Sequence, residues 1–193
     1  MTASRISEEK PDLSPVLGEL DEEGAGRLQT ELAAADESLT GIVGRLDAHG
    51  GNGFHSEGVL LEQEVSGQAL ISVLLEDAKG TVGFSAELRP RNFYADDGDP
   101  WQPGRPPMVM DTSGWDVGGE VAVRYKTRVG GRAYTIQEQV LELEEERYDS
   151  PDEAVAAFAG LCGRLAELAL SRDPTVAAWK PEIPESVGGP RVG

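Results

Sequence analysis

The sequence has few positive charges for its length. Its 193 residues contain 17 Lys+Arg against 35 Asp+Glu, which gives a formal net charge of -18 at pH 7. A protein needs a basic surface to neutralise nucleic-acid phosphates or to dock on anionic lipids. We therefore expect neither nucleic acid nor a membrane surface to be a partner.

Cysteine and long apolar segments are also scarce. The single cysteine, Cys162, cannot form an internal disulfide, which favours a reducing, cytoplasmic environment. Residues 1–10 are polar and lack the apolar stretch of a secretory signal, and no run approaches the roughly 20 apolar residues of a membrane span. We expect a soluble cytoplasmic protein.

The remaining composition is that of a globular protein, with 39% hydrophobic and 27% charged residues. The distribution along the chain predicts three regions. Residues 1–20 are expected to form a flexible N-terminal arm, residues 21–180 a single α+β domain, and residues 181–193 a disordered C-terminal tail rich in Pro and Gly.

Two segments have helical periodicity. Between Glu22 and Ala48, apolar residues recur every three or four positions, which predicts an amphipathic helix with one solvated face. The residues expected on that solvated face are Arg27, Glu31, Asp36, Glu37, Arg45 and Asp47. A second helix is predicted from the Ser150-Pro151-Asp152-Glu153 start signal to Pro174.

The intervening segments alternate with period two, which predicts strands. Three of them, 59–65, 69–75 and 82–88, are joined by short turns and should therefore pair antiparallel. After a Pro/Gly/Asp-rich loop over residues 90–107, a long strand from Trp115 and a return strand from Tyr134 flank a Gly130-Gly131 turn. A change of parity near Val140 predicts a β-bulge.

These elements predict an α+β fold. We expect a two-layer sandwich in which a five- or six-stranded antiparallel meander carries the N- and C-terminal helices packed on one face. The helix–strands–helix order is similar to that of secretion-chaperone-like α+β folds. This is a resemblance of element order, with no shared motif behind it.

No combination of residues indicates a catalytic centre. His49 and His55 flank a Gly-rich turn and could share a metal ion, but a third ligand would be needed, and none is nearby in sequence apart from Asp47 and Glu57. A helix end followed by a flexible connector is the expected role of this segment. Cys162 lies on the apolar face of a helix, where a core thiol is expected rather than a nucleophile. Four glutamates alternate with apolar residues as on an ordinary solvated strand face: Glu62, Glu64, Glu142 and Glu144. We expect no enzymatic activity, no metal and no cofactor.

The strongest candidate for partner binding is the loop over residues 90–107. It combines aromatic residues and prolines, which favour interfaces, with an acidic turn. The predicted partner-binding residues are Phe93, Tyr94, Asp96, Asp97, Asp99 and Trp101. Removing Trp101 should then weaken partner binding with little change in melting temperature. The alternative is a loop that folds back as a cap on the sandwich.

The sequence thus predicts a non-catalytic, acidic protein-binding module of the chaperone, adaptor or immunity type, whose partner presents a basic face. Two alternatives remain open. One is a small-molecule-binding or enzymatic domain with a cleft between sheet and helices, lined by Trp115, Tyr125 and Tyr134. The other is a structural subunit of a homo-oligomeric assembly.

Overall fold

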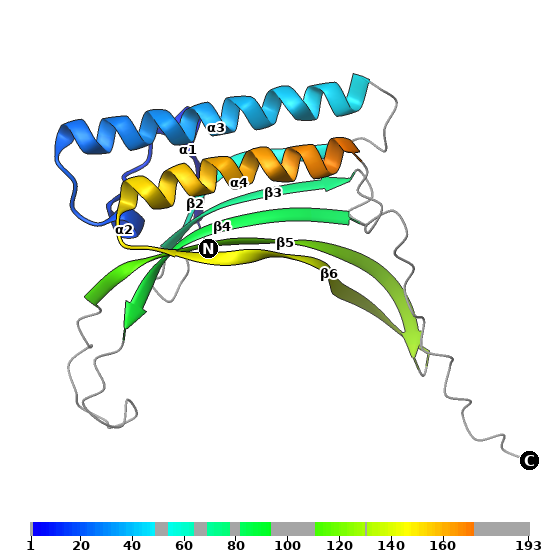
Figure 1. Ribbon diagram of the computed structural model, residues 1–193. Helices are drawn as coiled ribbons and strands as arrows, with labels where there is room; N and C mark the ends of the chain where they lie inside the picture. Colours follow the sequence, from blue (N-terminus) through cyan, green and yellow to red (C-terminus); the bar gives the residue numbers. More distant parts are fainter. Residues whose placement is uncertain are drawn as a thin grey trace, which may run out of the picture.

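In the computed structural model the chain forms a sheet layer and a helix layer (Figure 1). The structure describes residues 2–48, 54–63, 69–77, 82–93, 111–129 and 131–171. The strands are β1 (Thr2–Arg5), β2 (Phe54–Gln63), β3 (Ala69–Asp77), β4 (Val82–Phe93), β5 (Asp111–Val129) and β6 (Arg132–Tyr148). The helices are α1 (Ile6–Glu9), α2 (Ser14–Leu17), α3 (Glu22–Ala48) and α4 (Pro151–Ser171).

The six strands form one antiparallel sheet in the order β1-β2-β3-β4-β5-β6. Helices α3 and α4 lie side by side over the same face of this sheet (Figure 1). The predicted two-layer α+β sandwich is confirmed. The predicted bounds of the first long helix and the predicted start of the last one also agree with the structure.

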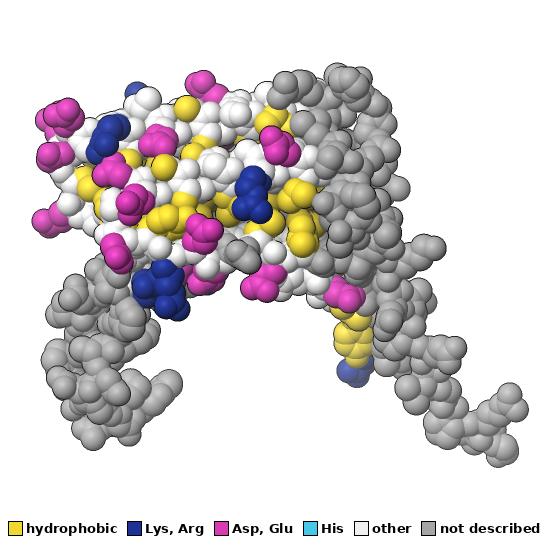
Figure 2. Space-filling view, in the orientation of Figure 1, with side chains coloured by type: hydrophobic (Ala, Val, Ile, Leu, Met, Phe, Trp, Pro, Cys, Tyr) yellow, Lys and Arg dark blue, Asp and Glu magenta, His cyan; other side chains and the backbone are white. Residues whose placement is uncertain are grey.

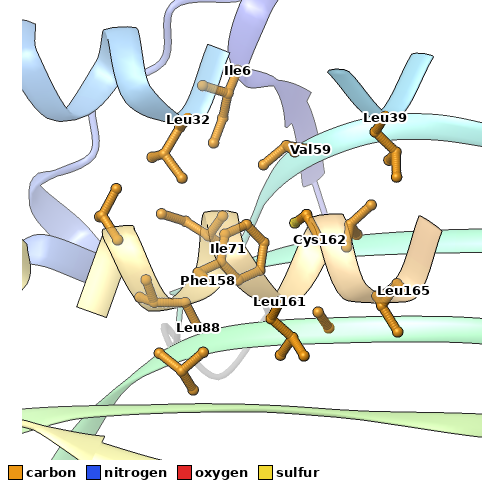
Figure 3. Close-up of a cluster of buried hydrophobic side chains, with 14 of the residues drawn as sticks. Ile6, Leu32, Leu39, Val59, Ile71, Leu88, Phe158, Leu161, Cys162 and Leu165 are labelled. Carbon is orange, nitrogen blue, oxygen red and sulfur yellow. The ribbon is translucent and has the colours of Figure 1, made fainter. Parts of the chain in front are cut away.

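The core lies between the two layers and consists of the residues that the periodicities place on the dry faces. On α3 these are Leu28, Leu32 and Leu39, and on α4 Phe158 and Leu165 are fully buried. Figure 3 shows Phe158 at the centre of this cluster, with side chains from α3, α4 and the sheet around it. Burying such apolar side chains gives roughly 1.5–3 kcal/mol each, which fixes the helices on this face.

The structure of the N-terminal segment differs from the flexible arm that was predicted over residues 1–20. Residues 2–5 form the edge strand β1, paired with β2 from Thr2 opposite Gln63 to Arg5 opposite Leu60. The side chains that follow enter the core: Ile6, Leu13, Val16 and Leu17 are buried. The segment is ordered because these apolar anchors and one sheet edge hold it.

The position of Asp36 also differs from the prediction. The periodicity of α3 places it on the solvated face, yet only 1% of its surface is exposed. It lies where α3 meets the N-terminal segment and β2, and it accepts hydrogen bonds from Arg5, Ser7 and the Val59 backbone. A carboxylate can be buried when donors surround it in this way.

The strands differ from the prediction mainly at their ends. β4 continues through Pro90 to Phe93, so the predicted loop over residues 90–107 begins later; a bulge between Pro90 and Asn92 accommodates the proline. The predicted bulge at Val140 is confirmed, since Leu141 faces Val121 while Gln139 faces Ala122. The predicted tail over residues 181–193 lies outside the described residues.

The face of the sheet that carries none of the described helices is concave (Figure 1). The strands arch so that α3 and α4 sit on the outer side of the bend, with the open face on the inner side (Figure 1). The end of the β5–β6 hairpin projects past the helices. Tyr134, near this end of β6, is 47% exposed.

Candidate functional site

The open face of the sheet carries alternate residues of every long strand. Their partners on the same strands point into the core, so period two separates the two sets. On β4 the open-face positions include Ser85, Glu87 and Arg89, and on β5 they include Gly118, Glu120 and Ala122. In the register, Ser85 lies opposite Glu120 and Glu87 lies opposite Gly118. The open-face positions of β6 include Gln139, Glu142 and Glu145.

A hollow of about 340 Å³ opens at the centre of this face. Its floor lies at Gly118 and Gly119, two consecutive glycines in the middle of β5. Of the two, Gly118 is the open-face position, opposite Glu87 of β4, and a Cβ atom there would lie 3.3 Å from the Cα and Cβ atoms of Glu145 on β6. The absence of a side chain at Gly118 therefore leaves a depression between β4 and β6.

Acidic side chains surround this hollow. Its carboxylates come from three neighbouring strands: Glu87, Glu120, Glu142 and Glu145. Arg89 is the cation in the lining, and it is bound to Glu145 at 2.7 Å. Among the described side chains, no cation lies within ion-pair distance of Glu87 or Glu142, and both are exposed. We call this group the acidic hollow.

Beside the acidic hollow, Arg124 connects side chains of neighbouring strands on the open face. This residue of β5 reaches past β4 to bind Glu76 of β3, and its Nε donates to Gln137 Oε1 of β6 at 3.0 Å. Gln137 in turn lies 3.4 Å from Glu120. A second hollow of about 230 Å³ adjoins these groups and is flanked by Leu74, which is 41% exposed. The open face therefore offers fixed polar groups, carboxylates and some apolar surface.

The partner-binding residues predicted from the sequence fall mostly outside the described residues. Phe93 ends β4, and its backbone pairs with Asp111 of β5. Tyr94, Asp96, Asp97, Asp99 and Trp101 belong to the segment between β4 and β5 that is not described. Their assignment to an interface stays a prediction.

The residues proposed for a cleft between sheet and helices do not come together. Trp115 is buried, and its indole Nε1 donates to the Val16 carbonyl of α2 at 2.8 Å. Tyr134 is exposed on the far part of β6. The side chain of Tyr125 lies outside the described residues. Trp115 thus packs in the core, and Trp115 and Tyr134 do not form an aromatic pocket.

The groups considered for metal binding or catalysis are likewise separate. Cys162 is buried, and burial raises the pKa of its thiol to about 12, as expected of a core thiol. His55 is exposed on β2, with Glu76 as its nearest acidic neighbour at 3.8 Å. Glu62 and Glu142 lie on β2 and β6, which are not adjacent strands. No group of three metal-ligating side chains occurs among the described residues.

The acidic hollow is the site that sequence reasoning missed. Of its glutamates, Glu142 was predicted on a solvated strand face, and it is exposed, but alternation alone does not say which solvated residues are neighbours. The signal that could have found it is the Gly118-Gly119 pair inside a strongly alternating strand, because such glycines mark a close backbone approach.

Comparison of the chain with protein-family models, with curated proteins and with solved structures gave no match. In the described part of the chain, no helix has the length and apolarity to cross a membrane. Function is therefore argued from the residues themselves.

Proposed function

We propose that this protein is a non-catalytic cytoplasmic module that binds a basic segment of another protein. It would act as a chaperone, adaptor or immunity-type protein. The observation that carries the proposal is the acidic hollow on the concave open face of the sheet, with Glu87 and Glu142 exposed and without a described counter-ion.

The charge of the whole chain supports this function. A net charge of -18 attracts a basic partner over a distance of about one Debye length and raises its association rate. Such steering is unspecific by itself, and specificity needs fixed groups at short range. The pairs Arg89–Glu145 and Arg124–Glu76 supply fixed groups around the hollow.

The shape of the site supports a protein partner. The hollow, of about 340 Å³, has room for a Lys or Arg side chain that enters from an extended or looped segment. Leu74, which is 41% exposed, provides apolar contact beside the carboxylates. A long basic side chain with an apolar stem matches this combination of neighbours.

The test uses a synthetic peptide of about ten residues in which Lys and Val alternate, titrated calorimetrically into the protein at physiological salt. Glu142→Lys should weaken binding roughly fivefold or more, since it replaces attraction with repulsion at the rim of the hollow. Glu37→Lys is the matched control, because it makes the same charge change at an exposed position of α3. It should change affinity by less than about twofold.

Equal losses in the two variants would mean that only net charge attracts the peptide, and the proposed site would be wrong. A peptide with Glu in place of Lys should not bind. If it binds as well as the Lys peptide, charge complementarity plays no part and the function must be sought elsewhere.

A further inference from the structure

The strand β6 is a long sheet edge. It spans 17 residues, and among the described strands it pairs only with β5. An edge strand presents backbone N–H and C=O groups to any extended segment that can lie beside it. The opposite edge is different, because β1 has only 4 residues. β6 is therefore the edge on which a further strand can be added.

A groove runs between β6 and α4 on the helix side of this edge. It has a volume of about 690 Å³, and its apolar lining includes Leu141, Leu143 and Leu168. Figure 2 shows hydrophobic side chains gathered in the strip between α4 and β6, with Asp and Glu side chains around it. The groove exists because α4 packs mainly over β4 and β5, so the helix layer stops short of the edge.

The rim of the groove is mainly acidic. Glu142, Glu146 and Glu167 line it together with Arg164. Glu142 also lines the acidic hollow on the open face, so the two surfaces meet at β6. Glu146 accepts a hydrogen bond from the Tyr148 hydroxyl, which raises the pKa of Tyr148.

An added strand would direct its side chains alternately to these two surfaces. Those on the open side would face Gln139, Glu142 and Glu145, which favour Lys or Arg. Those on the helix side would enter the groove beside Leu141 and Leu168, which favours apolar residues flanked by basic ones. The two sides together specify a strand in which basic and apolar residues alternate.

A second copy of the chain does not fit this description. Antiparallel pairing of two β6 strands centred near Val140 would set Glu138 opposite the copy's Glu142, and both are exposed. Like charges directly opposite one another destabilise strand pairing. Each chain would also carry a net charge of -18 into the dimer. The acidic edge thus discourages self-association and admits a basic strand.

We propose that β6 accepts an extended segment of the partner protein as an additional strand, with basic residues toward the open face and apolar residues in the groove under α4. The inference rests on the proposed function and says in which form the partner is bound. Main-chain hydrogen bonds would supply affinity, and the acidic and apolar surfaces would supply selectivity.

The experiment uses the full chain and the same alternating Lys/Val peptide. Glu167→Lys changes the groove only, Glu87→Lys changes the hollow only, and both positions are exposed. Glu167 is chosen over Glu146 because Glu146 is engaged by Tyr148. Strand addition predicts that Glu167→Lys weakens binding roughly fivefold, while the control Glu37→Lys stays within about twofold. Glu87→Lys should also weaken binding, because Glu87 belongs to the acidic hollow.

Hydrogen exchange gives the second readout. The peptide should slow exchange of the β6 amides between residues 137 and 146 that point away from β5, because an added strand pairs with those groups. If Glu87→Lys weakens binding, Glu167→Lys does not, and β6 exchange is unchanged, the edge proposal is overturned while the proposed function stands. If neither variant weakens binding and Glu142→Lys also fails to do so, both are wrong.

Two other occupants would also be detected. Sedimentation of the free protein as a dimer with protected β6 amides would assign the edge to a second copy. Slow exchange of the same amides in a free monomer, unaffected by the peptide, would show that the chain covers its own edge. Either result overturns the proposal.

Discussion

The carboxylate of Asp36 on α3 is bound to the guanidinium of Arg5 on β1, with Asp36 Oδ2 and Arg5 Nε 3.0 Å apart. The other carboxylate oxygen, Oδ1, accepts the Val59 amide of β2 at 2.9 Å, and the Ser7 hydroxyl donates to Oδ2. One buried group thus joins the N-terminal strand, the first long helix and the sheet. The hydrogen bond to Asp36 is the main cause that raises the pKa of Arg5, so this cation stays charged.

Replacing Asp36 with Ala should destabilise the fold by about 2–4 kcal/mol, because Arg5 and the Val59 amide lose their shared acceptor inside the structure. Urea unfolding followed by circular dichroism measures the loss. The neighbouring Glu37→Ala is the control, since Glu37 is exposed, and it should stay within about 0.5 kcal/mol of the parent. Equal effects of the two substitutions would mean that Asp36 does not hold the N-terminal segment.

Gly58 is the residue that lets β2 approach this carboxylate. Its φ is +90°, and a Cβ atom there would lie 2.2 Å from Asp36 Oδ1 and 2.5 Å from Arg5 Nε. Gly58→Ala should therefore cost more than the roughly 1–2 kcal/mol of a left-handed alanine alone. Gly131→Ala is the matched control, with φ +81° and nothing within 4 Å.

The excess loss at Gly58 should shrink when Asp36 is also Ala, because the obstructing oxygen is then absent. A double-mutant cycle on the urea unfolding free energies measures this coupling. Additive losses would contradict the packing of Gly58 against the carboxylate.

The buried thiol of Cys162 should make the stability of the protein depend on pH in the alkaline range. Its pKa is raised from 9.0 to about 12, and desolvation by burial is the main cause. The unfolded chain releases the thiol proton from about pH 9 upward while the folded chain retains it. The contribution is therefore fully present below pH 9 and is lost as the pH rises toward 12, with a slope of about 1.4 kcal/mol per pH unit.

Unfolding in urea under reducing conditions at pH 8 and pH 10 measures the effect. The difference in unfolding free energy between the parent and Cys162→Ala should fall by about 1–1.5 kcal/mol between the two pH values. A difference that does not change with pH would show that the thiol ionises in the folded protein. Rapid modification of native Cys162 by a thiol reagent would point the same way.

The sequence allowed the sandwich to be predicted because each long element is buried on one side only. In α3 the repeat of Leu28, Leu32 and Leu39 reports the side that faces the sheet, and in β3 the alternation through Ile71 and Val73 does the same. These patterns are local, so they can be recognised in the sequence without knowing which elements pack against each other.

What could not be predicted depends on contacts between distant parts of the chain. The four residues of β1 have no apolar alternation, and they are a strand because the edge of β2 and the Asp36–Arg5 pair hold them there. Asp36 itself looks like any acidic residue beside an apolar stripe. Asp36 is buried because the side chain of Arg5, which lies 31 positions earlier, donates a hydrogen bond to its carboxylate.

The acidic hollow follows the same rule. Alternation identified Glu142 as a solvated residue, but only the register of β5 and β6 sets it opposite Glu120. The groove beside β6 depends on where α4 stops across the sheet, which no periodicity in α4 encodes. A site built from strand neighbours is thus less visible in a sequence than the core beneath it.

Trp115 gives a last test of how the N-terminal segment is held. Its indole N–H donates to the Val16 carbonyl of α2 across 99 positions of sequence, at 2.8 Å. Trp115→Phe should destabilise the protein by about 1–2 kcal/mol and speed amide exchange around α2, because a buried carbonyl loses its donor while an aromatic ring remains. Tyr134→Phe is the control, since Tyr134 is 47% exposed, and it should change stability by less than about 0.5 kcal/mol. If both variants unfold at the parent's urea concentration and α2 exchange is unaltered, apolar burial of Val16 and Leu17 alone anchors the segment, and the indole hydrogen bond contributes nothing measurable.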